Sequence, residues 1–503
     1  MHKFGRLFTL IACVFFTLSC ADKEHRDYVG LEDQSFREWM KKYHSDLVGN
    51  FQEDGSYYVD VVALGEEDKP AVKDTICWVR IEFTGRDLGG NVCVTRDELL
   101  ARQVGSFTKH THYVPLYRLC SANATSGLID GLQRAMNTTL KLDETYASER
   151  DLPTEFNVRI GTELVLYMPS SIVGSLSASG GYEGQEINGT VYSLSSDRPL
   201  IAYVKVLDIV KNPLEWEGGE VDAFAEQNGL LKPVPKDEES EDESEKSSTR
   251  GAEEPQYNDG YQWRSAVDSV PQLYINHTYK PSLDRSKFLK YRSTYRSALA
   301  PYNDMAALDE QINKALLERF GEGTLEGDSV KMDGTAKIWY IGRFLDGFIF
   351  DTNIDEVKQL IYGKVDSEGS EISITPEEDK GSYVDSWYYS VPQLRYGQWA
   401  CVLGISTYNY GSTGQMGETT TSTTYDSSYY DMINYYNYMN SYYGNSYYGG
   451  YYNNYYNNYY YGYYNDYYYN NDYSQSATTV TTISTEIQSY TPLLFQIYIE
   501  EKE

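Results

Sequence analysis

A strand–turn–strand pattern that occurs twice restricts the fold of this 503-residue chain more than any other feature. Residues 80–90 alternate apolar and polar side chains, residues 337–347 begin with an apolar run over 338–341, and both segments hold two glycines at the same spacing. The glycines are Gly85 and Gly90 in the first copy and Gly342 and Gly347 in the second. A two-residue apolar period predicts a strand, and glycines after such a run predict a turn. Each half also closes on an alternating strand, at 200–209 and 493–499, so we predict an internal duplication of one α+β fold.

An amphipathic helix is predicted before each copy. In residues 36–47 the apolar positions recur every three or four residues and share one face. Residues 303–320 show the same period, and Asn303 is a suitable cap for the first turn. Each copy is therefore expected to begin with a helix that packs one apolar face on a core.

An acidic stretch separates the two copies. Residues 213–260 hold fifteen acidic side chains against four basic ones, and residues 237–245 contain no apolar residue. Such a run repels itself and stays extended, which predicts a solvated linker. A calcium site is the alternative, but no glycine-turned loop of the EF-hand type frames it. The predicted domains are therefore 34–212 and 261–503.

The charge and the metal-binding residue types exclude some classes of function. The formal net charge is −31, which argues against nucleic acid as a partner because phosphate binding requires basic patches. The cysteines show no CxxC spacing and the six histidines are scattered, so neither a metal site nor a cofactor is predicted.

The N-terminus predicts export. Residues 1–19 combine a basic start with an apolar run that is too short to span a bilayer permanently. The run ends in Thr17-Leu18-Ser19-Cys20, which resembles the lipobox of bacterial lipoproteins, although Thr17 stands where that family prefers leucine. The resemblance implies acylation of Cys20, a tether over residues 20–33 and attachment to a membrane of the bacterial cell envelope. A plain secretory signal is the alternative.

Tyrosine is concentrated in one segment: 23 of the 51 tyrosines lie between Tyr425 and Tyr473. Residues 419–475 show no helical or strand period, and a buried phenol without a partner is costly, so we predict a disordered low-complexity insertion. The insertion interrupts the second copy before Ile487. Two interpretations stay open: a region that binds unfolded client chains, or a tolerated expansion of a surface loop.

The second copy carries the most specific motif. Residues 340–351 follow the pattern Y-x-G-x-x-x-D-G-x-x-F-D, which resembles the signature of FKBP-type peptidyl-prolyl cis-trans isomerases. Five further positions match that family's pocket in order and spacing: an apolar residue, a floor tryptophan, the second tyrosine of a Y-x-Y-G segment, a flap isoleucine and a last-strand phenylalanine. They are Val384, Trp387, Tyr410, Ile487 and Phe495. The resemblance implies two FKBP-like domains, each an antiparallel sheet wrapped on a short helix.

The resemblance also implies a reaction. Rotation about an X-Pro bond must break amide conjugation, with a barrier of about 18–20 kcal/mol. A twisted amide loses its charge separation, so a dry apolar pocket favours it without a nucleophile, metal or cofactor. The implied catalytic residues are Tyr340, Phe350, Asp351, Trp387 and Tyr410, and Val384, Ile487 and Phe495 are implied to bind substrate. Trp387 would lie under the proline ring, Tyr410 would hold a substrate carbonyl, and Asp351 would orient the amide.

The first copy departs from this pattern at the pocket. Cys93-Val94, Leu132 and Ala202 stand where the family has Phe-Asp, the floor tryptophan and the last phenylalanine, and Val173 replaces the tyrosine. We therefore predict that the first copy keeps the fold and lacks the catalytic pocket.

Two functions remain from the sequence. The first is a lipid-anchored prolyl isomerase that acts on proline-containing exported polypeptides through its second domain. The second is a non-catalytic binding or chaperone-like lipoprotein of the same fold. In the second case the aromatic residues are ordinary core and the Asp351 carboxylate only caps a turn.

Overall fold

The computed structural model describes residues 28–73, 76–121, 128–173, 185–187, 190–192, 198–227, 263–276, 301–365, 368–415, 417, 419–425 and 477–502. The predicted signal peptide, Cys20 and the start of the predicted tether lie outside these residues. The chain forms two compact units, Met1–Phe107 with Tyr113–Asn212, and Thr108–His112 with Pro213–Glu503. Within the described ranges, no helix has both the length and the apolar character needed to cross a membrane.

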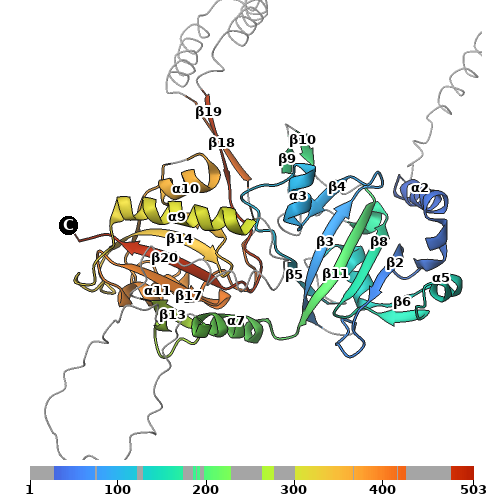
Figure 1. Ribbon diagram of the computed structural model, residues 1–503, viewed down its shortest axis with the longest axis horizontal. Helices are drawn as coiled ribbons and strands as arrows, with labels where there is room; N and C mark the ends of the chain where they lie inside the picture. The colour runs from blue at the N-terminus through green and yellow to red at the C-terminus, as the bar shows by residue number, and fades with distance from the viewer. Residues whose placement is uncertain are drawn as a thin grey trace, which may run out of the picture. The chain divides into compact units, whose positions relative to one another are not determined.

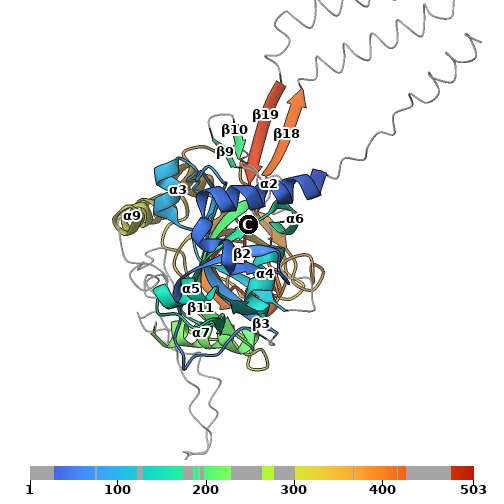
Figure 2. The same ribbon diagram turned by 90° about the vertical axis from the view of Figure 1, so that its right-hand side faces the viewer.

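The first unit is built on a seven-stranded antiparallel sheet of order β1-β2-β8-β11-β3-β4, with β5 paired to β3. These strands are β1 (Phe51–Gln52), β2 (Tyr57–Leu64), β3 (Cys77–Arg86), β4 (Val92–Thr95), β5 (Leu116–Cys120), β8 (Thr162–Met168) and β11 (Leu200–Val210). Two hairpins, β6 (Thr139–Lys141) with β7 (Glu155–Asn157) and β9 (Gln185–Ile187) with β10 (Thr190–Tyr192), stand apart from it. The helices are α2 (Tyr28–Tyr43), η1 (Ser45–Asn50), α3 (Glu98–Val104), α4 (Asp130–Asn137), α5 (Glu144–Glu149) and α6 (Ser170–Val173). Helix α6 contacts both α2 and α4, and Figure 2 shows the three grouped on one side of the unit.

The second unit repeats this sheet. Its order is β12-β13-β17-β20-β14-β15, with β16 paired to β14, so each strand has a counterpart in the first unit. Figure 1 labels its central strands β13, β17, β20 and β14. The strands are β12 (Arg264–Ser265), β13 (Leu273–Asn276), β14 (Ala336–Phe344), β15 (Ile349–Thr352), β16 (Ile372–Ile374), β17 (Trp399–Gly404) and β20 (Leu493–Ile499), and a separate arm pairs β18 (Thr419–Tyr425) with β19 (Ala477–Ile483). The helices are α7 (Pro213–Gln227), α9 (Pro301–Phe320), α10 (Asp355–Tyr362), α11 (Asp385–Ser390), η5 (Val391–Gln393) and η6 (Ser406–Tyr408). The predicted α+β class with two antiparallel sheets is confirmed.

The paired glycines of the repeat have two different physical roles. A Cβ at Gly342 would lie 2.5 Å from Phe350 Cζ, and a Cβ at Gly85 would lie 2.8 Å from Val94 Cγ1. A larger residue there would therefore displace the side chain of the adjacent strand. The second glycine of each pair, Gly90 or Gly347, has a φ of +85° or +86°, a conformation that favours glycine in a turn. The same two constraints thus fix the same hairpin twice.

In the first half, the structure places two helix boundaries differently from the sequence prediction. Helix α2 begins at Tyr28, inside the predicted tether, because its first turns also bond to the domain: Ser170 Oγ donates to Glu32 at 2.9 Å. The helix predicted over 36–47 ends at Tyr43, and Leu47 is buried in the separate 3-10 helix η1. The ordered first unit therefore starts earlier than its apolar period alone indicates.

The linker and the insertion are also shorter than predicted. Residues 213–227 form helix α7, and its Val221, Phe224 and Ala225 are buried in an apolar cluster of the second unit. The prediction of solvated linker is wrong for these residues, because their apolar face outweighs their charge. At the other site, Thr419–Tyr425 forms strand β18, consistent with the β-propensity of its threonines. The acidic core of the linker and the bulk of the tyrosine-rich segment lie outside the described residues.

Both faces of the second sheet are covered. Successive residues of β14 point to opposite faces, so Ile338 and Phe344 join one apolar cluster with Trp387 of α11. Trp339 and Ile341 join another cluster with Ile312 and Leu316 of α9, which runs along the sheet in Figure 1. The candidate site lies on the α11 face, and the α9 face supports it from behind.

Candidate functional site in the second unit

Four aromatic side chains from four elements meet on the α11 face. Trp387 of α11 lies 5.2 Å from the ring of Tyr340 on β14 and 5.3 Å from the ring of Phe495 on β20, measured between centroids. Phe350 of β15 lies 5.9 Å from Phe495, with the two rings nearly perpendicular. Trp387, Phe495 and Phe350 are buried, and Tyr340 packs against them partly exposed. Edge-to-face packing of this kind is favourable for aromatic rings and leaves an apolar surface.

The other predicted apolar residues join the same cluster. Ile487 is buried in it, and Val384 and Tyr410 pack against it while partly exposed. Val384 is the residue before α11, and its carbonyl accepts the N–H of Trp387 at 3.0 Å. The structure therefore brings all seven predicted apolar or aromatic site residues to one place. Asp351 stands at the edge of the group as an exposed side chain.

One carboxylate sets the electrostatics of the group. The Tyr340 hydroxyl donates to Oδ2 of Asp351, and the backbone N–H of Thr352 donates to Oδ1 at 2.8 Å. Burial first, and then Asp351, raise the pKa of Tyr340. The same two causes raise the pKa of both Tyr410 and Tyr362 to about 12. All three phenols therefore stay protonated and remain hydrogen-bond donors at neutral pH, and the Tyr340 phenol donates to the Asp351 carboxylate.

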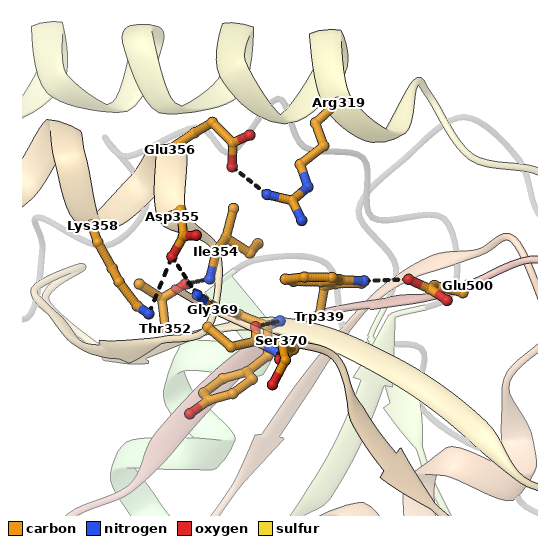
Figure 3. A network of polar contacts seen from close by, with 12 residues as sticks. Arg319, Trp339, Thr352, Ile354, Asp355, Glu356, Lys358, Gly369, Ser370 and Glu500 are labelled. Carbon is orange, nitrogen blue, oxygen red and sulfur yellow. Dashed lines mark hydrogen bonds and ion pairs between the residues drawn. The ribbon is translucent and has the colours of Figure 1, made fainter. Parts of the chain in front are cut away.

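The backbone of Tyr340 is held on both sides by Thr352, the last residue of β15, and by Asn353, which follows it. Its N–H donates to Asn353 Oδ1 at 2.8 Å, and its carbonyl accepts from the hydroxyl of Thr352 at 2.6 Å. Asn353 in turn donates to the carbonyls of Ile338 and Ser370, each at 3.0 Å. Figure 3 shows this network with neighbouring contacts of the α9 face. The wall residue is thus fixed by side chains that the family signature does not include.

Helix α9 reinforces the network from the opposite face. Arg319 bonds to Glu356 of α10 at 2.6 Å and lies 4.1 Å above the ring of Trp339 (Figure 3). The Trp339 indole donates to Glu500 at 2.6 Å. These contacts connect α9, α10, β14 and the chain after β20, on the face of β14 opposite Tyr340.

The turn that carries Tyr410 is connected to the helix that carries Trp387. Ser386 of α11 donates to Asn409 Oδ1 at 2.7 Å, and Asn409 Nδ2 donates to the carbonyls of Gly404 and Ile405 at 3.2 and 3.0 Å. Sequence reasoning missed Ser386 and Asn409. Each lies beside a residue that matches the family pattern, which is the only sequence signal that would have indicated them.

The buried indole N–H of Trp387 differs from these polar groups in its hydrogen bonding. Among the described residues Trp387 Nε1 has no hydrogen-bond partner, although the side chain is 3% exposed. A buried donor usually has an acceptor, so Trp387 Nε1 is an exception within this cluster.

The corresponding place in the first unit is filled with small and aliphatic side chains. Ala202 pairs with Gly85 as Phe495 pairs with Gly342, and Val94 pairs with Gly85 as Asp351 pairs with Gly342. Leu132 of α4 and Val173 of α6 are buried in the apolar core. The first unit therefore keeps an aromatic side chain at Phe83, the counterpart of Tyr340, and lacks the other three aromatic walls and the carboxylate.

In the part of the chain that the structure describes, no three His, Cys, Asp or Glu side chains are grouped so that they could bind a metal ion. The chemistry available at the site is that of apolar walls, phenol donors and one carboxylate.

Comparison with known proteins gives solved structures that resemble this chain, several of them FKBP domains. No family model and no curated protein matches the sequence. Among solved structures, the three FKBP domains of wheat FKBP73 align at 8% identity over 89% of this chain and 95% of that chain, with a TM-score of 0.21. FkpA from Escherichia coli aligns at 16% identity over 41% and 71%, with a TM-score of 0.21. A peptidyl-prolyl cis-trans isomerase from Pseudomonas syringae aligns at 13% identity over 35% and 90%, with a TM-score of 0.19. At these TM-scores we draw no conclusion from the alignments, and the case for function is made from the site.

Proposed function

We propose that the second unit is an FKBP-type peptidyl-prolyl cis-trans isomerase. The observation that carries the proposal is the convergence of Tyr340, Phe350, Trp387 and Phe495 on one apolar cluster with the Asp351 carboxylate at its edge. These residues come from four separate elements, and they are the positions that the family signature and its spacing select. A structural core alone has no need of a phenol-bonded carboxylate at its rim.

The residues act by stabilising a twisted amide. The proline ring would lie on Trp387, and the surrounding rings would exclude water from the X-Pro bond. The planar amide is more polar than the twisted one, so transfer to this surface raises the ground state relative to the transition state. Each 1.36 kcal/mol of such difference gives about tenfold in rate. The protonated Tyr410 hydroxyl would donate to a substrate carbonyl, and Asp351 would hold Tyr340 and orient the amide.

We also propose that the protein acts in the bacterial cell envelope. The motif Thr17-Leu18-Ser19-Cys20 supports acylation of Cys20, and acyl chains would attach the protein to a membrane. Its clients would then be exported polypeptides that contain proline. Cys20→Ala is expected to release the protein from the membrane fraction; continued membrane attachment of this variant would contradict the anchor.

The tyrosine-rich insertion is proposed to bind client chains near the pocket. Gln415 and Ile487 exchange backbone hydrogen bonds of 2.8 Å in both directions, and the β18–β19 arm follows this bridge. Ile487 is itself a pocket residue. The segment between Tyr425 and Ala477 is therefore attached through a paired arm to the wall of the site, which would raise the local concentration of a bound client.

The experiment that tests the function follows a short proline-containing peptide by NMR with the purified chain. Acceleration of cis–trans exchange supports the isomerase. Shifts of the Trp387 indole signal without acceleration would support the second candidate, a binding protein. If the chain neither accelerates exchange nor shows indole shifts, both candidate functions are contradicted.

A further inference from the structure

Helix α7 reaches the turn that carries Tyr410 through a buried carboxylate. Glu217 is 0% exposed, and its two oxygens bond to the same residue, Ser406. The backbone N–H of Ser406 donates to Oε1, and the Ser406 hydroxyl donates to Oε2 at 2.7 Å. Ser406 is the first residue of η6 and is itself buried. A distant glutamate thus caps the start of this 3-10 turn, where backbone N–H groups lack partners within the turn.

Ser406 also binds the residues on either side of Tyr410. Its carbonyl accepts the N–H groups of both Asn409 and Gly411 at 2.8 Å. These two residues flank Tyr410 in the chain. The donors of Ser406 are therefore bound by Glu217, and its acceptor binds the residues on either side of the phenol.

Contacts that do not involve Glu217 place the helix. Phe224 of α7 packs with Trp263, Leu403 and Ile405, and Ile405 directly precedes Ser406. Asp222 accepts a hydrogen bond of 2.7 Å from the Tyr274 hydroxyl on β13. The carboxylate of Glu217 is therefore presented to the turn by an anchored helix.

We propose that Glu217 is a positioning residue of the isomerase site, which fixes the Ser406–Gly411 turn and thereby the hydroxyl of Tyr410. The inference rests on the proposed function for its consequence in catalysis, and on the geometry alone for its consequence in the turn. Helix α7 would then stabilise the site, although no residue of this helix belongs to the family signature.

The test compares variants of the full chain by hydrogen exchange and by peptide isomerisation. Glu217→Ala leaves the two Ser406 donors without this acceptor, and loss of two buried hydrogen bonds is expected to raise exchange of the Asn409 and Gly411 amides about tenfold or more. The same variant is expected to lower kcat/KM about tenfold through the misplaced phenol. Glu217→Gln keeps one oxygen acceptor and can donate to the Ser406 hydroxyl, so it should restore exchange and kcat/KM to within about threefold of the wild type.

The controls separate this inference from the proposed function. Glu215→Ala, at an exposed position of the same helix, should change neither readout. Ser406→Ala removes only one of the two bonds and should raise exchange of the same amides about threefold, which tests the link if Glu217→Ala does not fold. Unchanged exchange at Asn409 and Gly411 in Glu217→Ala and Ser406→Ala would overturn the positioning role. An inactive wild type would contradict the isomerase, and the exchange result would still decide the role of Glu217.

Discussion

The hydroxyl of Tyr340 on β14 donates a hydrogen bond to the carboxylate of Asp351 on the adjacent strand β15. Tyr340 is a wall of the aromatic cluster, and Asp351 is the negative charge at its rim. The pairing joins the apolar and the polar parts of the candidate site. It exists because Gly342 lets Phe350 pack across the hairpin, after which Asp351 pairs with Gly342.

The first prediction concerns this carboxylate. Asp351→Asn removes the charge but keeps one acceptor for Tyr340, so we expect kcat/KM to fall about tenfold because a charge-assisted bond becomes a neutral one. The free energy of unfolding should change by less than about 1 kcal/mol because the side chain is exposed. Peptide isomerisation rates and urea unfolding measure the two quantities. A kcat/KM equal to that of the control Asp333→Asn would remove Asp351 from the site.

The second prediction separates two tyrosines of one turn. Tyr410→Phe removes the hydroxyl proposed to hold a substrate carbonyl, and we expect kcat/KM to fall about fivefold to tenfold. Tyr408→Phe removes a hydroxyl two residues away, from a ring that packs near Tyr389, and should be within about twofold of the wild type. Equal losses in the two variants would argue against a specific role for Tyr410.

The third prediction concerns the support of the sheet from helix α9. Arg343 is fully buried, and its Nη1 bonds to Asp309 at 3.2 Å and to the turn carbonyl of Gly347 at 3.1 Å. Asp309→Ala leaves this charge without its carboxylate and should cost about 3–5 kcal/mol in urea unfolding. Glu310→Ala, exposed on the same helix, should change stability by less than about 0.5 kcal/mol. Similar values for both variants would contradict the importance of the buried pair.

The fourth prediction is a pH dependence of stability. Burial raises the pKa of Glu217 from 4.5 to about 7, against the opposing effect of the Ser406 donors. As the pH rises above 4.5 the unfolded chain loses this proton first, so the unfolding free energy falls until the pH exceeds about 7. Relative to Glu217→Gln, which does not titrate, the wild type should lose about 3 kcal/mol between pH 4 and pH 8. Parallel stability profiles for the two proteins would show that the pKa is not raised.

The fifth prediction concerns the insertion. Tyr425 and Ala477 are paired residues at the end of the β18–β19 arm, so residues 426–476 can be replaced by an Asn-Gly turn. We expect this variant to isomerise short peptides at the wild-type rate, because the pocket residues are retained. Refolding of a proline-limited protein should be accelerated several-fold less than by the intact chain, because client capture is lost. Equal acceleration by both proteins would favour the loop expansion without function.

Much of the aromatic cluster was predictable because strand and turn chemistry is local. The apolar run around Tyr340 and the glycine spacing at Gly342 and Gly347 indicate a hairpin, and the hairpin places Phe350 and Asp351 together. The spacing to Trp387 and Phe495 then follows from the family pattern. The structure assembles these residues on one face of one sheet.

The parts that were not predictable depend on contacts distant in the sequence. Glu217 lies in a stretch where charge indicates a solvated linker, and only its partner Ser406 and the apolar packing of Phe224 explain its burial. The network that holds Tyr340 uses Thr352 and Asn353, whose roles depend on backbone geometry after β15. A polar residue in a turn carries no sequence signal that distinguishes such a role from exposure.

The central claim is most directly tested by two tryptophans on opposite faces of the same sheet. Trp387→Leu gives the second unit the residue that the first unit has at Leu132, and Trp399→Leu makes the same change in the cluster on the α9 face. Exchange NMR on a short X-Pro peptide measures cis–trans interconversion, which is slow without a catalyst, at tens to hundreds of seconds. The account predicts clear acceleration by the wild type and by folded Trp399→Leu, and at least about tenfold less by folded Trp387→Leu. No acceleration by the wild type, or equal acceleration by both variants, would contradict it.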